Sequence, residues 1–218
     1  MIQALRHVAL TPEVNAPGPQ PTVIMVHGRG ADEEDLPGLA GRLDPRLLVL
    51  SVRAPYPFAP GGGYTWYDVG AVGAPEPAMF QESSARLSQF VDEALREYPI
   101  DPARLFLLGF SMGTVMSLAL SLSRPGLVRG VSANSGYVAE GTHLTYHWNE
   151  LAATSFFIAH GTFDPVIPVI MARRAKELFA ASNAPHLYRE YPMAHQITDQ
   201  SLSDIAAWLK PLLDASGS

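Results

Sequence analysis

The fold is decided by the stretch Leu105-Phe106-Leu107-Leu108-Gly109-Phe110-Ser111-Met112-Gly113. Its first four residues form an apolar run typical of a buried strand, and a segment with helical spacing follows Gly113. Glycines at 109 and 113 permit a sharp reversal between strand and helix, because a side chain at either position would collide with neighbouring backbone. Ser111 then projects from the tip of a strand–turn–helix unit.

Further apolar runs of the same kind recur along the chain and alternate with segments of helical spacing. The strands are expected at 5–10, 22–26, 47–52, 105–108, 127–133, 156–159 and 186–191. The helices are expected at 31–43, 77–98, 113–123, 168–182 and 201–213, with Ser201 as the N-cap of the last. Strands that alternate with helices form a mostly parallel sheet covered by helices on both faces, so the fold class is α/β.

The amino-acid composition argues against several classes of function. The 218 residues are 47% hydrophobic and 17% charged, and no linker divides them, so we expect one domain over residues 1–218. The net charge is −6 and the lysines and arginines are scattered, which disfavours a nucleic-acid partner. The absence of cysteine excludes disulfides and thiolate chemistry. No stretch of 18 apolar residues occurs, so we expect a cytoplasmic protein without stable membrane insertion.

A serine at the tip of such a turn is the pattern of a nucleophile elbow. The hydroxyl is a weak nucleophile unaided, and it requires a general base with a pKa near neutrality. Of the seven histidines, His195 fits best, because it lies in the loop between the last expected strand and the last expected helix. His27 and His160 each precede a glycine at a strand end, and we expect them to shape loops.

An aspartate must orient the imidazole of the base. Asp164 lies in the turn after the strand ending near Ala159, between Ser111 and His195 in the chain. The order Ser, Asp, His is the one that hydrolases with this turn use, and it favours Asp164 over the competing Asp199 and Asp204.

Two backbone N–H groups are candidates for an oxyanion hole. The N–H of Met112 starts the helix after the nucleophile, and the N–H of Arg29 lies in the glycine-rich segment after an early strand. The alternative for Arg29 is a glycine-rich turn without chemistry. His143, His147 and Glu150 would share a helix face and offer metal ligands, but nothing near them argues for a metal, and we expect none.

These residues resemble the carboxylesterase/phospholipase family of α/β hydrolases, which includes the acyl-protein thioesterases and small bacterial carboxylesterases. The matching motifs are Val26-His27-Gly28, Gly109-Phe110-Ser111-Met112-Gly113, His160-Gly161-Thr162-Phe163-Asp164-Pro165-Val166-Ile167-Pro168 and Tyr191-Pro192-Met193-Ala194-His195. The resemblance implies the α/β-hydrolase fold with a seven-strand sheet and a minimal lid. It also implies a cofactor-free mechanism through an acyl-enzyme, with Ser111, Asp164 and His195 as the triad and Arg29 and Met112 as oxyanion donors.

The sequence therefore predicts a serine carboxylesterase acting on short-to-medium acyl esters, with a small-molecule ester as partner. Trp66, Tyr67, Val166 and Ile167 are expected to line the substrate pocket. Lysophospholipase and acyl thioesterase activities are alternatives. Many thioesterases of this family carry glutamine and glycine where this chain has Met112 and Thr114. An acyltransferase or a small-molecule binding protein on the same fold is the alternative from another class, and a homodimer is one possible assembly.

Overall fold

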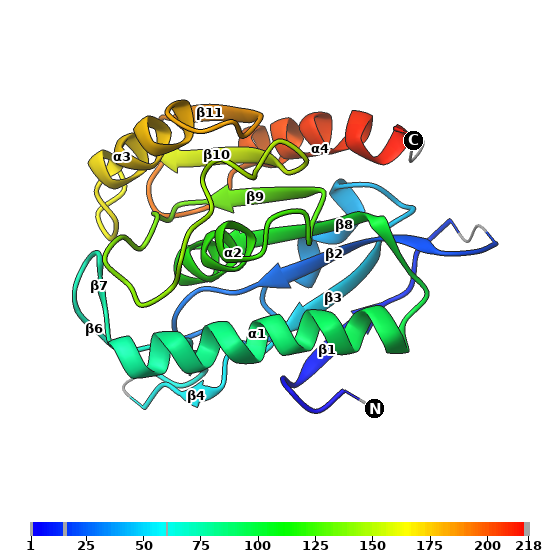
Figure 1. Cartoon of the computed structure of the whole chain (residues 1–218), viewed down its shortest axis with the longest axis horizontal. Helices are drawn as coiled ribbons and strands as arrows, with labels where there is room; N and C mark the ends of the chain where they lie inside the picture. Colours follow the sequence, from blue (N-terminus) through cyan, green and yellow to red (C-terminus); the bar gives the residue numbers. More distant parts are fainter. Residues whose placement is uncertain (1, 15–16, 60, 216–218) are drawn as a thin grey trace.

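A computed structural model describes residues 2–14, 17–59 and 61–215. Its centre is a seven-stranded sheet in the order β1-β3-β2-β8-β9-β10-β11 (Figure 1). The strands are β1 (His7–Leu10), β2 (Gln20–Val26), β3 (Leu48–Val52), β8 (Ile100–Phe110), β9 (Gly130–Asn134), β10 (Ser155–Gly161) and β11 (His186–Tyr191). Only β1 runs antiparallel to its neighbour, β3. The predicted α/β class and mostly parallel sheet are confirmed.

The central strands are apolar on both faces, as a sheet covered on two sides requires. Successive residues of β2 alternate between two cores: Ile24 and Val26 pack on one side, and Val23 and Met25 on the other. The first core contains buried residues of α1 (Pro77–Glu97), α2 (Met112–Ser123) and α3 (Val169–Ala180). The second contains those of α4 (Asp199–Asp214). The helices therefore divide between the two faces.

Two helices differ from the sequence prediction. The prediction of a helix at 31–43 is wrong, because only the 3-10 helix η1 (Pro37–Arg42) forms there. Proline lacks the backbone N–H that an interior helical residue donates, so Pro37 interrupts the expected helix and starts the shorter one, and Ala31 instead bridges to Tyr64. Ser201 is not the N-cap of α4, because Thr198 occupies that position and Ser201 completes a capping box with it.

The segment between β3 and α1 contains two short hairpins. One pairs β4 (Tyr56–Pro57) with β5 (Tyr64–Thr65), and the other pairs β6 (Val69–Ala71) with β7 (Ala74–Pro75). Glu76 then caps α1 through its side chain, with Pro77 at the first helical position. In the described part of the chain, no helix forms between β9 and β10.

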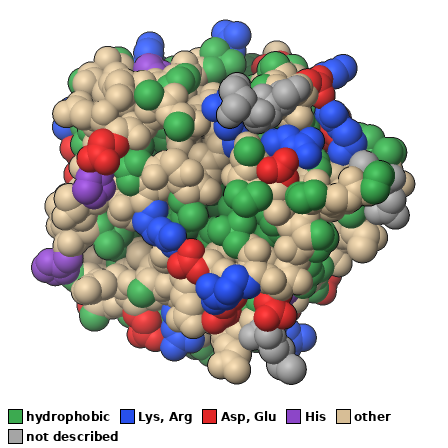
Figure 2. Space-filling view, turned by 45° about the vertical axis from the view of Figure 1, so that its right-hand side comes forward, with side chains coloured by type: hydrophobic (Ala, Val, Ile, Leu, Met, Phe, Trp, Pro, Cys, Tyr) green, Lys and Arg blue, Asp and Glu red, His purple; other side chains and the backbone are tan. Residues whose placement is uncertain are grey.

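The surface carries charges of both signs. On the face shown in Figure 2, lysine and arginine side chains are interspersed with aspartate and glutamate. No helix among the described residues is long and apolar enough to cross a membrane.

Candidate active site

Ser111 forms the junction between β8 and α2. Its backbone has φ 53° and ψ −119°, a conformation that costs a non-glycine residue about 1–3 kcal/mol. A Cβ at Gly113 would lie 1.9 Å from the carbonyl oxygen of Val26, and one at Gly109 would lie 2.6 Å from Cα of Thr114. The two glycines are therefore required for the turn that projects Ser111.

The structure brings Ser111, His195 and Asp164 together from three separate loops. Nε2 of His195 lies 2.9 Å from Oγ of Ser111, and Nδ1 of His195 lies 2.7 Å from Oδ2 of Asp164. An ionised carboxylate only accepts, so Nδ1 carries the proton and Nε2 is free to accept from the serine hydroxyl. This tautomer is the one that a general base requires.

Asp164 is held in place by its own turn. Its Oδ1 accepts hydrogen bonds from the N–H groups of Val166 and Ile167, each at 2.9 Å. Its side chain is fully buried, whereas the side chain of His195 is 16% exposed. The carboxylate is thus fixed in the interior, and the imidazole that it orients reaches the cavity.

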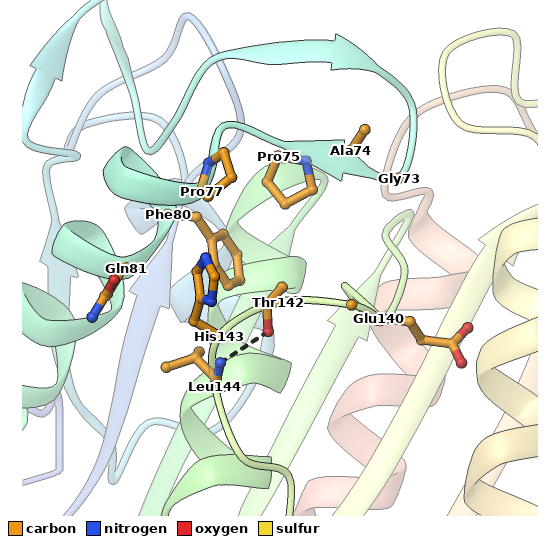
Figure 3. A pocket seen from close by; sticks show the side chains of 11 residues that line it. Gly73, Ala74, Pro75, Pro77, Phe80, Gln81, Glu140, Thr142, His143 and Leu144 are labelled. Carbon is orange, nitrogen blue, oxygen red and sulfur yellow. Dashed lines mark hydrogen bonds between the residues drawn. The ribbon is translucent and has the colours of Figure 1, made fainter.

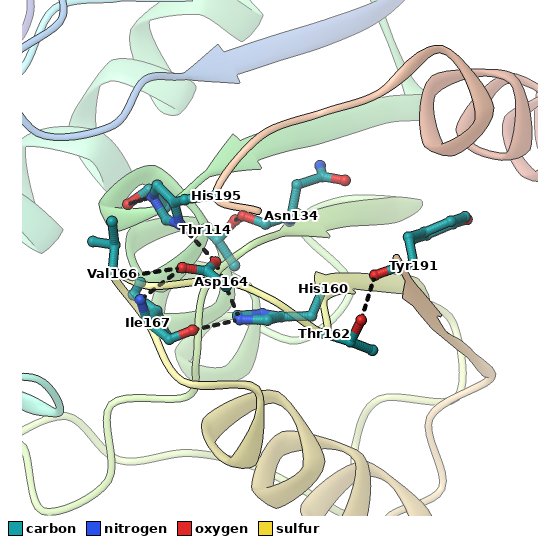
Figure 4. Close-up of polar contacts among 10 residues, drawn as sticks. Thr114, Asn134, His160, Thr162, Asp164, Val166, Ile167, Tyr191 and His195 are labelled. Atoms are coloured by element: carbon teal, nitrogen blue, oxygen red, sulfur yellow. Dashed lines mark hydrogen bonds and ion pairs between the residues drawn. The ribbon is translucent and has the colours of Figure 1, made fainter. Parts of the chain in front are cut away.

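His195 is positioned by the loop between β11 and α4. The N–H of Phe163 donates to the carbonyl oxygen of Met193 at 3.1 Å, which ties the Asp164 turn to the His195 loop. The imidazole also packs against the ring of Phe110, with the centroids 5.0 Å apart. Figure 4 shows His195 directed toward Asp164 from this loop.

Arg29 and Met112 line the same cavity as Ser111. Among the described residues, neither backbone N–H donates to a protein acceptor, and Met112 is the first residue of α2, where no intrahelical acceptor exists. Both N–H groups are available to an oxyanion. The Arg29 guanidinium lies over the ring of Phe58, 4.5 Å from its centroid.

His27 shapes the Arg29 loop, as its position before a glycine indicated. Its Nδ1 donates to the carbonyl oxygen of Gly28 at 2.6 Å, and its Nε2 accepts from the N–H of Ala54 at 3.0 Å. Burial lowers the pKa of this histidine, so the ring is neutral. Both ring nitrogens are satisfied, and His27 offers no base to the cavity.

The cavity beside Ser111 has a volume of about 140 Å³ and is mainly apolar. Its wall contains Tyr67, Val69, Val72, Met112, Tyr137, Val166 and Ile167. Trp66 does not line it, contrary to the sequence prediction. Trp66 is fully buried, and its indole N–H donates to the carbonyl oxygen of His27, so the side chain belongs to the core behind the Arg29 loop.

A second and larger cavity, about 280 Å³, contains none of the triad residues. It lies between β7, the start of α1 and residues 140–144 (Figure 3). His143 lines this cavity, whereas His147 lies 3.1 Å from Oε1 of Glu150 in a segment without helix, so the three do not share a helix face. Within the described ranges, no group of three histidines or carboxylates could hold a metal ion.

Sequence reasoning missed four contributors to this site. Val69, Val72 and Tyr137 line the cavity, but they were not among the residues expected there. His160, expected to shape a loop, lies with its ring beside Asp164. The only signal in the sequence for His160 was its position at the end of a strand, with one helix and one strand between it and His195.

Comparison with known proteins identifies the family of this chain. Residues 11–213 match the Phospholipase/Carboxylesterase family. The chain is 25% identical over 220 residues to acyl-protein thioesterase 1 from Candida albicans, covering 92% of this chain and 95% of that protein. It is 26% identical over 161 residues to carboxylesterase SOBER1 from Arabidopsis thaliana, covering 71% of this chain and 70% of that one.

Solved structures show the same fold. The crystal structure of the Bacillus cereus carboxylesterase matches with a TM-score of 0.83 and 26% identity, over 95% of this chain and 94% of that one. A carboxylesterase from Mesorhizobium loti matches with a TM-score of 0.84 at 22% identity, over 95% of both chains. The family match extends over nearly the whole chain, and the protein is therefore a member of the phospholipase/carboxylesterase family of α/β hydrolases.

Proposed function

We propose that this protein is a serine esterase that hydrolyses short-to-medium acyl esters through an acyl-enzyme. The observation that carries the proposal is the continuous chain of contacts from Ser111 through His195 to Asp164, at 2.9 and 2.7 Å. A pure binding role is less well supported, because it has no use for a general base aligned on a serine. An acyltransferase would use the same triad and stays a prediction from the sequence.

In the first step, Ser111 Oγ attacks the ester carbonyl carbon and its proton passes to His195 Nε2. The negative charge that forms on the carbonyl oxygen is stabilised by the N–H groups of Arg29 and Met112. One such donor is worth about 2.7–4 kcal/mol in the transition state. The C–O bond then breaks, and the leaving alkoxide takes the proton from His195.

In the second step, water attacks the acyl carbon of the Ser111 ester and gives its proton to His195 Nε2. Collapse of the tetrahedral intermediate releases the carboxylic acid and returns the proton to Ser111 Oγ. Asp164 stays ionised throughout and stabilises the imidazolium that forms in each step.

The apolar wall of the cavity supports an acyl group as the part of the substrate bound beside Ser111. Acyl thioesters are a second candidate, supported by the similarity to acyl-protein thioesterase 1 over nearly the whole chain. A thioester presents the same carbonyl to Ser111, so the two activities share one mechanism. Lysophospholipid cleavage, a cytoplasmic location and a homodimer stay predictions from the sequence.

Hydrolysis of p-nitrophenyl esters from acetate to palmitate, by the wild type and Ser111→Ala in parallel, tests the proposal. We expect turnover with a maximum at short or medium chains and a loss in kcat of about 10⁴-fold or more in Ser111→Ala. Turnover retained by Ser111→Ala would refute the assignment of the nucleophile. A preference for acyl thioesters over matched oxygen esters would favour the second candidate.

A further inference from the structure

His160 is a second imidazole that faces the triad carboxylate. It lies near the end of β10, and its side chain is fully buried, as is the side chain of Asp164. Its Nε2 lies 2.8 Å from the carbonyl oxygen of Ile167 and 3.4 Å from Oδ2 of Asp164 (Figure 4). The same Oδ2 atom accepts the hydrogen bond from His195. One carboxylate oxygen is therefore shared by two imidazoles.

The contacts of His160 determine its tautomer. A carbonyl oxygen only accepts, so the proton of the neutral ring is on Nε2, where it donates to Ile167. Nδ1 is buried and has no hydrogen-bond partner among the described residues. A second proton on Nδ1 would be buried without an acceptor, which is energetically costly. Burial accordingly lowers the pKa of His160, and the ring stays neutral.

The turn from Asp164 to Ile167 is fixed from both sides by this arrangement. The N–H of Ile167 donates to Oδ1 of Asp164, and its carbonyl oxygen accepts from His160. Ile167 also lines the cavity beside Ser111. Loss of the His160 N–H would leave a buried carbonyl oxygen without its partner at the residue that connects the cavity wall to the triad acid.

We propose that His160 is a positioning residue for Asp164: its Nε2–H fixes the 164–167 turn and partly neutralises Oδ2, while the neutral ring leaves His195 as the imidazole that takes the proton. This inference rests on the proposed function. Burial distinguishes the two rings, since the His195 side chain is 16% exposed and borders the cavity, whereas His160 is enclosed.

Three ionisable groups act on His160 from the elements around it. Asp164 lies in its own loop, His195 in the loop after β11, and Glu190 on β11. Glu190 is already paired with Arg173 through two hydrogen bonds of 2.8 Å. Asp164 is therefore the carboxylate whose charge the His160 N–H affects most directly.

The test uses His160→Gln, which keeps an N–H donor at a similar reach, and His160→Met, which has no donor. His186→Gln is the matched control, because His186 lies on β11 and is exposed. The pH profile of kcat/KM for p-nitrophenyl butyrate is measured for each variant, with thermal unfolding to check the fold. The pH midpoint at which the His195 ring titrates is measured by NMR, a readout that does not depend on turnover.

We expect His160→Met to lower kcat by about 10- to 100-fold, a range comparable with the losses seen when hydrogen-bond partners that orient metal-binding histidines are removed. Without the His160 N–H, the negative charge on Oδ2 is less compensated, so it stabilises the protonated His195 ring more strongly. The acid limb of the profile and the NMR midpoint of His195 then both move to higher pH. His160→Gln should recover most of kcat and the wild-type acid limb, and His186→Gln should match the wild type.

A folded His160→Met protein with wild-type kcat and an unmoved NMR midpoint would overturn the proposal. Equal losses in His160→Gln and His160→Met would also overturn it, because the donor would then not matter. If His160→Met fails to fold, His160→Asn replaces it, since the shorter amide does not reach Ile167. Turnover retained by Ser111→Ala would count against the proposed function instead, and the NMR midpoint would still decide the role of His160.

Discussion

Oγ1 of Thr114 donates a hydrogen bond to the carbonyl oxygen of Asn134 at 2.7 Å and accepts one from the N–H of the same residue at 2.8 Å. The Asn134 carbonyl oxygen also accepts from the N–H of Ser111 at 2.9 Å. Thr114 thus joins α2 to the end of β9 through the residue that also accepts from the N–H of Ser111.

Thr114→Val should destabilise the protein, because it keeps the side-chain shape and removes both hydrogen bonds. The buried N–H of Asn134 loses its partner, at a cost of about 1–3 kcal/mol in the free energy of unfolding. Thr114→Ser retains the hydroxyl and should lose much less. Urea unfolding of the two variants measures the difference, and equal stabilities would show that the hydroxyl contributes nothing.

Gly113→Ala should prevent formation of the turn at Ser111. The added Cβ would lie 1.9 Å from the carbonyl oxygen of Val26, which is backbone and has no room to move. Gly38 is the matched control, because a Cβ there meets nothing within 4 Å. Gly38→Ala should change the free energy of unfolding by about 0.5 kcal/mol or less. A folded Gly113→Ala protein with wild-type kcat would contradict this account of the turn.

Val69→Phe should shift the acyl-chain preference toward short chains, since Val69 lines the cavity beside Ser111 and a larger ring would fill part of it. We expect kcat/KM for p-nitrophenyl octanoate, divided by kcat/KM for p-nitrophenyl acetate, to fall at least about tenfold. Ile170→Phe is the control, because Ile170 is exposed and does not line that cavity. An unchanged ratio in Val69→Phe would place the acyl chain elsewhere.

Protonation of Glu190 should account for part of the fall in the free energy of unfolding at low pH. Two hydrogen bonds from Arg173 lower the pKa of Glu190 from 4.5 to about 2. The folded state therefore binds this proton less readily than the unfolded state, so the stabilisation is full above pH 4.5 and disappears as the pH falls to about 2. The difference in unfolding free energy between the wild type and Glu190→Gln should shrink over this window. The exposed Glu34→Gln serves as control, and a pH-independent difference for Glu190→Gln would contradict the linkage.

Much of the fold could be predicted from the sequence, because the relevant signals are local. An apolar run followed by Gly-x-Ser-x-Gly determines a strand, a turn and a helix within a short segment. All seven sheet strands were expected at or near their observed positions. The inner strands read as apolar runs because they are buried on both faces, whereas the edge strands β1 and β11 are more exposed. The placement of Ser111, Asp164 and His195 then follows from the rule that parallel strands end at a common edge.

The features that could not be predicted depend on contacts between residues that lie far apart in the sequence. Trp66 was expected in the pocket, but its indole N–H bonds to His27 across 39 positions of sequence, and no local pattern reports that contact. The contact of His160 with Asp164 requires the turn geometry of residues 164–167. The hairpins between β3 and α1 are short, and hydrogen bonds join Tyr64 of the first hairpin to Gly30 and Ala31 in the Arg29 loop, which is distant in the sequence.

Covalent labelling of Ser111 tests the central claim most directly. A fluorophosphonate reacts with a serine that an adjacent base activates, and it forms a stable phosphonyl ester at Oγ. We predict one adduct per chain, located by peptide mass spectrometry on Ser111, with loss of ester hydrolysis in proportion to labelling and no adduct in Ser111→Ala. Hydrolysis that persists in the fully labelled protein, or an adduct on another residue that abolishes it, would contradict the account.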